Sequence, residues 1–237
     1  MPRPQHNGAR LAAALLLLTA LPTAAQPGLK PLPRLGPKPP PIGQEVFASP
    51  LTPPTRTRFE AVCQTLARHP VVKGDFVQTK HLSRVDRFLV SQGFFAVDTA
   101  RGMLWDTREP FASTTAVGLN FVVQHSQGKS TRMDASGNET FLRMAQTLRA
   151  VFSGDTKTLD EAFEVFFREE KGVWLLGLRP KEASLKNFVQ ALVLQGDSVV
   201  RQLLLLEKNG DSIAYALFAH SFPAELSADE KALFGPP

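Results

Sequence analysis

Short runs of bulky apolar residues at every second position dominate the sequence between residues 71 and 222. Phe163, Val165 and Phe167 form one such run. A period of two is that of a β-strand with one buried face. Gly, Pro or Asn residues separate the runs, and Asn209 with Gly210 is the strongest hairpin signal in the chain. These patterns predict an antiparallel meander, with strands over residues 74–80, 87–97, 103–107, 114–125, 129–134, 163–169, 173–179, 188–194, 199–207 and 212–222.

A few segments have helical periodicity instead. Residues 56–69 repeat apolar side chains at helical spacing, and Pro70 ends that segment. Thr158 and Glu161 have the spacing of a capping box, which predicts a short helix starting at Thr158. A short helix or a frayed end is expected from residue 227. The chain is therefore expected to be α+β and mainly β.

The remaining predicted helix spans residues 138–153 and has one apolar stripe. It is the expected cover for one face of the sheet. Residues 203–206 are four consecutive leucines, so both faces of that strand are apolar and the sheet needs a cover on each side. The stripe of the helix consists of Phe141, Met144, Leu148 and Phe152.

The N-terminus has the order of a secretory signal. Arg3 and Arg10 precede the apolar run 11–21, which is too short to span a bilayer, and Ala25 closes a small-residue cleavage site. Export to the periplasm, with cleavage near Ala25, is expected. Residues 26–55 contain ten prolines and are expected to be a disordered linker. The expected organisation is a signal over 1–25, this linker, a domain over 56–226 and a tail over 227–237.

Charge and cysteine content exclude several classes of protein. Without the signal the chain has 25 basic and 22 acidic residues, a formal charge of +3. That small excess argues against nucleic-acid binding. Cys63 is the only cysteine, so the chain has no internal disulfide, and its apolar neighbours predict a buried thiol.

Motifs for catalysis are missing from the sequence. It has no nucleophile elbow, phosphate-binding loop, dinucleotide fingerprint, C-x-x-C or H-E-x-x-H pattern. Its five histidines are scattered. The acidic cluster of Asp155, Asp160 and Glu161 is better explained by helix capping. We therefore expect no enzymatic activity, no metal and no cofactor.

The aromatic composition favours dry contacts. The chain has 17 Phe against one Tyr, and Tyr is the aromatic residue that usually serves wet interfaces. Most of these side chains are expected to form the core of a sheet packed on helices. A curved sheet over an apolar helix also admits acyl chains between the two, because such an interface has no polar groups that need partners.

Several motifs, in this order, resemble one family. Residues 56–222 are similar to the periplasmic outer-membrane lipoprotein carriers (LolA) and LolA-like proteins. The likeness rests on a short amphipathic helix followed by Gly74–Gln78, Ser91–Phe95, Gly102–Trp105, Glu109–Phe111, Leu148–Asp155 and the hairpin at Gly210 and Asp211.

The resemblance implies a fold and a function. The fold is an incomplete, strongly curved antiparallel β-barrel with a helical lid and an apolar cavity. The protein would be a monomeric, chaperone-like carrier that receives acylated lipoprotein or lipid cargo from an inner-membrane transporter and delivers it to an outer-membrane acceptor. Met103 and Trp105 match apolar positions near the cavity mouth. Arg101 is the candidate for the arginine that latches the lid, although the family has an Arg-Pro pair at the positions of Thr99 and Ala100. The expected lipid-binding residues are Phe76, Phe95, Met103, Trp105, Phe141, Met144, Leu148 and Phe152.

Two other functions stay open. The same groove in an envelope interaction or sensor module would bind a peptide or a protein partner. A lipid-modifying hydrolase is the least supported, because no nucleophile has a plausible base nearby in the sequence. The cargo is also open, since the departure at Thr99 and Ala100 allows another envelope lipid.

Overall fold

One antiparallel sheet of 11 strands organises the protein. The structure is a computed structural model that describes residues 43–126, 128–134 and 139–235. The strands lie in the order β6-β5-β4-β3-β2-β1-β11-β10-β9-β8-β7, so pairing of β1 with β11 joins the two halves of the sheet. The strands are β1 (Val71–Leu82), β2 (Arg87–Asp98), β3 (Gly102–Glu109), β4 (Ser113–Val117), β5 (Phe121–Ser126), β6 (Lys129–Asp134), β7 (Phe163–Glu170), β8 (Val173–Pro180), β9 (Val189–Gly196), β10 (Val200–Glu207) and β11 (Ser212–Ser221).

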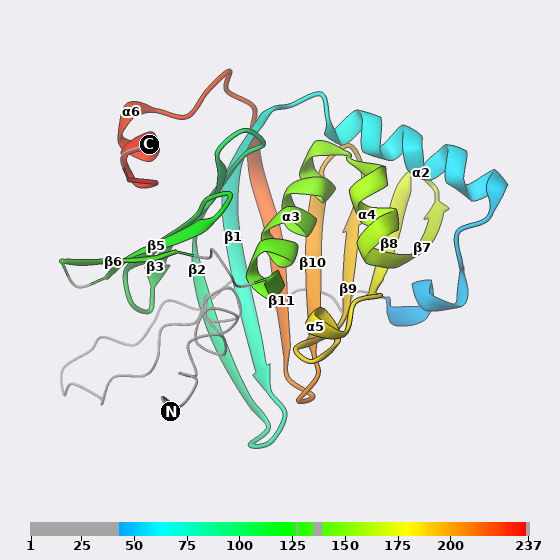
Figure 1. Cartoon of the computed structure of the whole chain (residues 1–237), viewed down its shortest axis with the longest axis horizontal. Helices are drawn as coiled ribbons and strands as arrows, with labels where there is room; N and C mark the ends of the chain where they lie inside the picture. The colour runs from blue at the N-terminus through cyan, green and yellow to red at the C-terminus, as the bar shows by residue number, and fades with distance from the viewer. Residues whose placement is uncertain (1–42, 127, 135–138, 236–237) are drawn as a thin grey trace, which may run out of the picture.

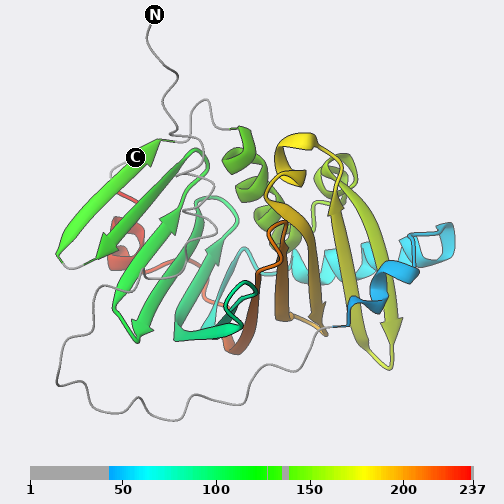
Figure 2. The ribbon, with the colours of Figure 1, turned by 90° about the horizontal axis from the view of Figure 1, so that it is seen from below.

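The sheet is bent and open. Figure 2 shows β3 to β6 as one wing and the strands around β8 as the other, with helices between them on the concave side. In the described part of the chain β6 and β7 are edge strands that do not pair with each other. The predicted unclosed, strongly curved antiparallel barrel with covering helices is therefore confirmed.

In the described part of the chain, helices cover the concave face of the sheet (Figure 1). Their buried residues form one hydrophobic cluster with alternate residues of the strands, because a strand directs every second side chain to the same face. Among the described residues no helix is both long and apolar enough to cross a membrane. The helices are α2 (Pro53–Leu66), α3 (Glu139–Ser153), α4 (Thr156–Ala162) and α5 (Ala183–Lys186).

Two short segments cover the convex face. The 3-10 helix η1 (Gln44–Ala48) places Val46 against Phe166 and Val193, and Leu204 packs on the same cluster. At the other wing, α6 (Ala228–Ala232) is flanked by buried Leu226 and Phe234. Leu203 and Leu205 lie in the concave cluster and Leu204 packs on the η1 side, which explains why this strand is apolar on both faces.

The N-terminal boundary of the folded unit corrects the expected linker. Residues 26–55 were predicted to be disordered, yet η1 packs on the sheet, Pro50 bridges Phe166, and α2 begins at Pro53 rather than at residue 56. Proline is compatible with the first turn of a helix because the N–H groups there need no partner within the helix. The predicted signal over 1–25 and linker residues 26–42 lie outside the described residues.

Two further boundaries differ from the prediction. Residues 114–125 form two strands, β4 and β5, because the Gly118 N–H donates to the Phe121 carbonyl at 2.9 Å and closes a tight turn. The short helix α4 begins at Thr156, not at Thr158. Its cap is Asp155, whose carboxylate accepts from the Thr158 N–H at 3.1 Å and the Thr158 hydroxyl at 2.7 Å. A carboxylate satisfies the first free N–H groups and suits the positive end of the helix.

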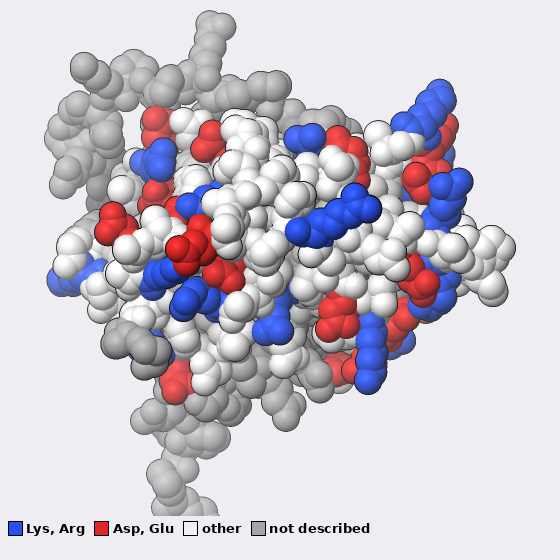
Figure 3. Space-filling view, turned by 90° about the horizontal axis from the view of Figure 1, so that it is seen from above, with Lys and Arg blue, Asp and Glu red and all other residues white. Residues whose placement is uncertain are grey.

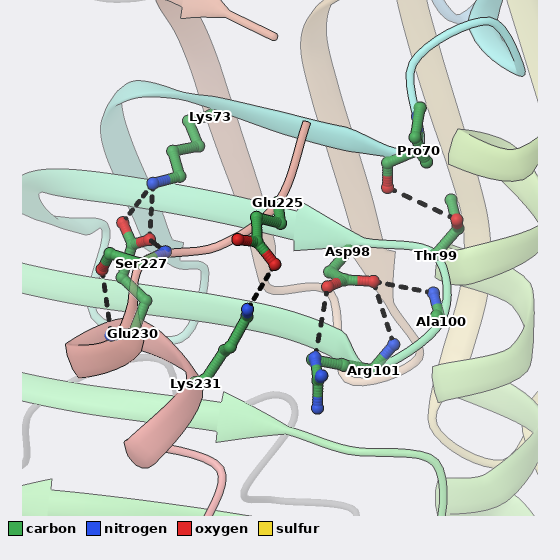
Figure 4. Close-up of polar contacts among 10 residues, drawn as sticks. All are labelled: Pro70, Lys73, Asp98, Thr99, Ala100, Arg101, Glu225, Ser227, Glu230 and Lys231. Atoms are coloured by element: carbon green, nitrogen blue, oxygen red, sulfur yellow. Dashed lines mark hydrogen bonds and ion pairs between the residues drawn. The ribbon is translucent and has the colours of Figure 1, made fainter. Parts of the chain in front are cut away.

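The C-terminal segment is tied to the sheet by the ion pair between Lys73 and Glu230 (Figure 4). Lys73 Nζ on β1 donates to both carboxylate oxygens of Glu230 at 2.5 and 2.7 Å. Glu230 also completes a capping box with Ser227 at the start of α6. Burial opposes ionisation of Glu230, but the hydrogen bonds from Lys73 and Ser227 outweigh it, so the pKa of Glu230 is lowered.

Glu230→Gln is expected to lower the free energy of unfolding by about 2 kcal/mol at neutral pH. A carboxylate with a lowered pKa stabilises the fold above its unfolded pKa, and the contribution is lost as pH falls through the folded pKa. The difference between variant and wild type should therefore shrink below about pH 4. Urea unfolding at pH 7 and pH 3.5 measures it. Glu225→Gln is the control, since the Glu225 carboxylate that pairs with Lys231 is exposed and should matter much less. Equal losses for the two variants would contradict this role of Glu230.

Candidate functional site in the concave face

The concave face brings together those predicted lipid-binding residues whose side chains are described. They come from β1, β2, β3 and the end of α3, and each is at most 6% exposed. Register explains the grouping, because Phe95 is paired with Trp105 and Val97 with Met103 across β2 and β3. Side chains of Phe141, Met144 and Leu148 lie outside the described residues, although their backbone belongs to α3. The residues brought into this one cluster are Phe76, Phe95, Met103, Trp105 and Phe152.

An aromatic group occupies the middle of the concave face. Trp105 lies 6.4 Å from Phe95 and 6.0 Å from Tyr215, measured between ring centroids, and Phe76 lies 6.1 Å from Tyr215. The sheet must be strongly bent there, because Trp105 and Tyr215 meet although two strands separate β3 from β11. Gly74 makes room for this packing, since a Cβ would lie 2.8 Å from the Phe95 ring. Tyr215 was predicted only as part of a strand pattern, and no sequence signal singled it out.

A small pocket opens at one rim of the concave face. It lies where α2, α3 and the turn between β9 and β10 come together, and its lining includes Leu66, Phe152 and His220. Burial, aided by nearby Arg201, lowers the pKa of His220, while the ring nitrogen Nε2 lies 3.0 Å from the Val200 carbonyl. A lowered pKa keeps the imidazole neutral at pH 7 and compatible with the apolar surroundings.

A few polar groups lie on the same concave face, and the sequence did not identify them as part of the site. Gln78 lies two residues after Phe76 on β1, and therefore on the same face of the strand, and is 1% exposed. Lys80 Nζ lies 3.6 Å from Glu207 Oε1, and both side chains are about nine-tenths buried. Burial raises the pKa of Glu207, and the positive charge of Lys80 partly offsets this. Among the described residues the side-chain oxygen of Gln78 and the indole N–H of Trp105 have no hydrogen-bond partner.

Arg101, the predicted latch, lies away from the concave cluster. It sits in the turn between β2 and β3, where Asp98 accepts from its backbone N–H at 3.2 Å and pairs with its guanidinium at 3.6 Å (Figure 4). It borders an open groove of about 900 Å³ whose lining includes Lys231 of α6 and Phe234 beyond the end of that helix. The role of Arg101 as a lid latch stays a prediction.

Other titratable groups have local structural explanations. Cys63 is a core residue of α2, and burial raises the pKa of its thiol to about 12. Asp160, expected to serve in capping, instead pairs with Arg56 at 2.6 Å. Within residues 43–126, 128–134 and 139–235 no group of three or more His, Cys, Asp or Glu side chains is arranged to hold a metal. Basic and acidic side chains are intermixed on the face in Figure 3.

The chain belongs to the outer membrane lipoprotein carrier protein LolA-like family, whose model matches residues 52–232. None of the curated proteins gives a significant match.

Solved structures with a similar architecture share little sequence with this chain. A DUF1329 family protein from Desulfovibrio piger is 9% identical, with a TM-score of 0.44, over 77% of this chain and 98% of that one. A LolA superfamily protein from Nitrosomonas europaea is 8% identical, with a TM-score of 0.42, over 73% of this chain and 96% of that one. The MucA/MucB complex of Pseudomonas aeruginosa gives 14% identity and a TM-score of 0.35, over 73% of this chain and 60% of that one. These likenesses are too distant to assign a ligand.

Proposed function

We propose that the protein is an exported periplasmic carrier and not an enzyme. In this proposal the segment 1–25 directs export, and the concave face shields the acyl chains of a lipoprotein or a related envelope lipid. An inner-membrane transporter supplies the cargo and an outer-membrane acceptor removes it. Membership of the LolA-like family supports this assignment. The observation that carries it is the continuous apolar cluster between the bent sheet and its helices.

The free energy of burying acyl chains suits a carrier that passes its cargo directly to an acceptor rather than one that releases it into water. Each methylene removed from water contributes about 0.8 kcal/mol, so a chain of about 15 methylenes contributes roughly 12 kcal/mol. Release into water is then too slow to be useful, and cargo has to pass directly to an acceptor. Helix α3 is the proposed lid. Its end is held by buried apolar residues such as Val151 and Phe152, and contacts of this kind separate without leaving hydrogen-bonding groups unpaired.

Lid variants test the proposal. Met144→Asp and Leu148→Asp are each expected to abolish binding of a fluorescent acyl probe while the far-ultraviolet circular dichroism stays unchanged, because a carboxylate in an acyl-binding surface must be desolvated. Gln146→Asp is the matched control, since Gln146 is an exposed residue of α3. Unchanged binding by the first two variants would remove α3 from the site.

Extraction of the purified protein separates the carrier from the alternatives. Organic solvent followed by mass spectrometry should release stoichiometric acyl lipid or lipoprotein. A protein that yields no lipid and binds no acyl probe would refute the carrier function. Retention of a peptide instead would favour the interaction or sensor module.

A further inference from the structure

The two tryptophans of the chain differ in one respect. Both belong to the concave hydrophobic cluster. Trp174 donates its indole N–H to the Asp197 carbonyl at 2.5 Å. Trp105 is 6% exposed, and its indole N–H has no partner among the described residues. Native proteins pair nearly all buried donors, so an unpaired one is a candidate contact for a ligand.

An unpaired acceptor lies on the same surface. Gln78 is paired with Tyr215 across β1 and β11, and its side-chain oxygen is buried without a partner in the described part of the chain. The ring of Trp105 lies 6.0 Å from the ring of Tyr215. The donor of Trp105 and the acceptor of Gln78 therefore both border the aromatic group in the middle of the concave face.

The chemistry of these two groups indicates a neutral polar partner. A carbonyl oxygen accepts from an indole N–H, and an amide N–H or a hydroxyl donates to a glutamine oxygen. A phosphate would favour a free cation, whereas Lys80 on the same face is already paired with Glu207. The amide linkage of an acyl chain has both the acceptor and the donor, the ester linkage has only the carbonyl acceptor that suits Trp105, and hydrocarbon has neither.

We propose that Trp105 and Gln78 form a polar anchor for the linkage of acyl cargo, in which the indole N–H of Trp105 donates to the carbonyl oxygen of an ester or amide and the Gln78 oxygen accepts from the N–H of an amide. The inference rests on the proposed carrier function and adds the class of cargo to it. The cargo is recognised by a linkage as well as by chain length, so the concave face distinguishes acyl chains from alkyl chains.

Paired ligands test the anchor in the whole protein. Dioctanoylglycerol has two ester carbonyls, and dioctylglycerol is its ether analogue with methylenes in their place. Displacement of a fluorescent acyl probe gives the affinity of each. Wild type is expected to bind the ester about five- to tenfold more tightly, as one hydrogen bond allows. Trp105→Phe should abolish this preference, because it keeps an aromatic ring and removes the N–H. The matched control Trp174→Phe should retain it.

Each outcome decides between the two proposals. Equal affinity of wild type for ester and ether would overturn the anchor and leave the carrier function standing. So would a preference that persists in Trp105→Phe. Failure of wild type to bind either ligand would refute the carrier function and the anchor together. The wild-type comparison decides the question even where a variant does not fold. Unfolding adds a second readout, since Trp174→Phe loses the bond to Asp197 and should be the less stable variant.

Discussion

Lys80→Met is expected to lower the free energy of unfolding by about 3–5 kcal/mol at neutral pH, because it leaves the buried carboxylate of Glu207 without its counter-charge. The Nζ and Oε1 atoms of the pair are 3.6 Å apart, and the two side chains are only 10% and 8% exposed. Lys80→Met/Glu207→Gln is the control variant. It removes both charges and should recover most of the lost stability.

The pH dependence of this loss has a definite sign. Burial raises the pKa of Glu207, so ionisation of this carboxyl opposes folding. The protonated carboxyl therefore contributes stability at pH values below its unfolded-state pKa, and this contribution is lost as pH rises through the folded-state pKa. Without Lys80 the pKa rises further. The penalty in Lys80→Met should therefore be larger at pH 8 than at pH 5, as measured by urea unfolding. If Lys80→Met is as stable as wild type at pH 8, the ion pair is dispensable.

Gly154→Ala is expected to cost about 3 kcal/mol or more, since two independent penalties act at this position. Gly154 has φ +66°, a conformation that favours glycine, and it joins α3 to α4. A Cβ there would lie 2.2 Å from the carbonyl oxygen of Cys63, which is backbone of α2 and cannot rotate away.

Gly172→Ala separates the two penalties. Gly172 has φ +79° in the turn between β7 and β8, but a Cβ there would meet nothing within 4 Å. Gly172→Ala should therefore lower the free energy of unfolding only by the cost of placing alanine at positive φ, about 1–2 kcal/mol. Chemical unfolding of both variants checks the difference. Equal losses would mean that α2 and α3 can separate at Cys63 without penalty.

Strands were the most predictable part of this molecule. Their periodicity is a direct consequence of one buried face, as in β7, where Phe163, Val165 and Phe167 all lie in the concave cluster. The hairpin at Asn209 and Gly210 was confirmed for the same local reason. The turn at Gly118 was missed, because the apolar alternation continues on both sides of it and only pairing of β4 with β5 reveals the break.

Features that depend on distant contacts could not be predicted. Nothing in the proline-rich composition of residues 26–55 indicates that Val46 fills a space beside Phe166 and Val193. The pattern and the family likeness did select several apolar residues that share the concave cluster. They did not indicate the unpaired N–H of Trp105, because whether a polar atom finds a partner is decided by the complete fold.

The way in which the edge strand β7 is covered has a practical consequence for expressing this protein. Backbone atoms of Ser49 and Leu51 hydrogen-bond to β7, and Val46 seals the apolar surface behind it. A fragment cut at residue 52, where the match to the family model starts, would lack all of these. It would present bare strand backbone next to exposed phenylalanine, which is the combination that promotes aggregation between chains. Recombinant versions are best begun at or before residue 43.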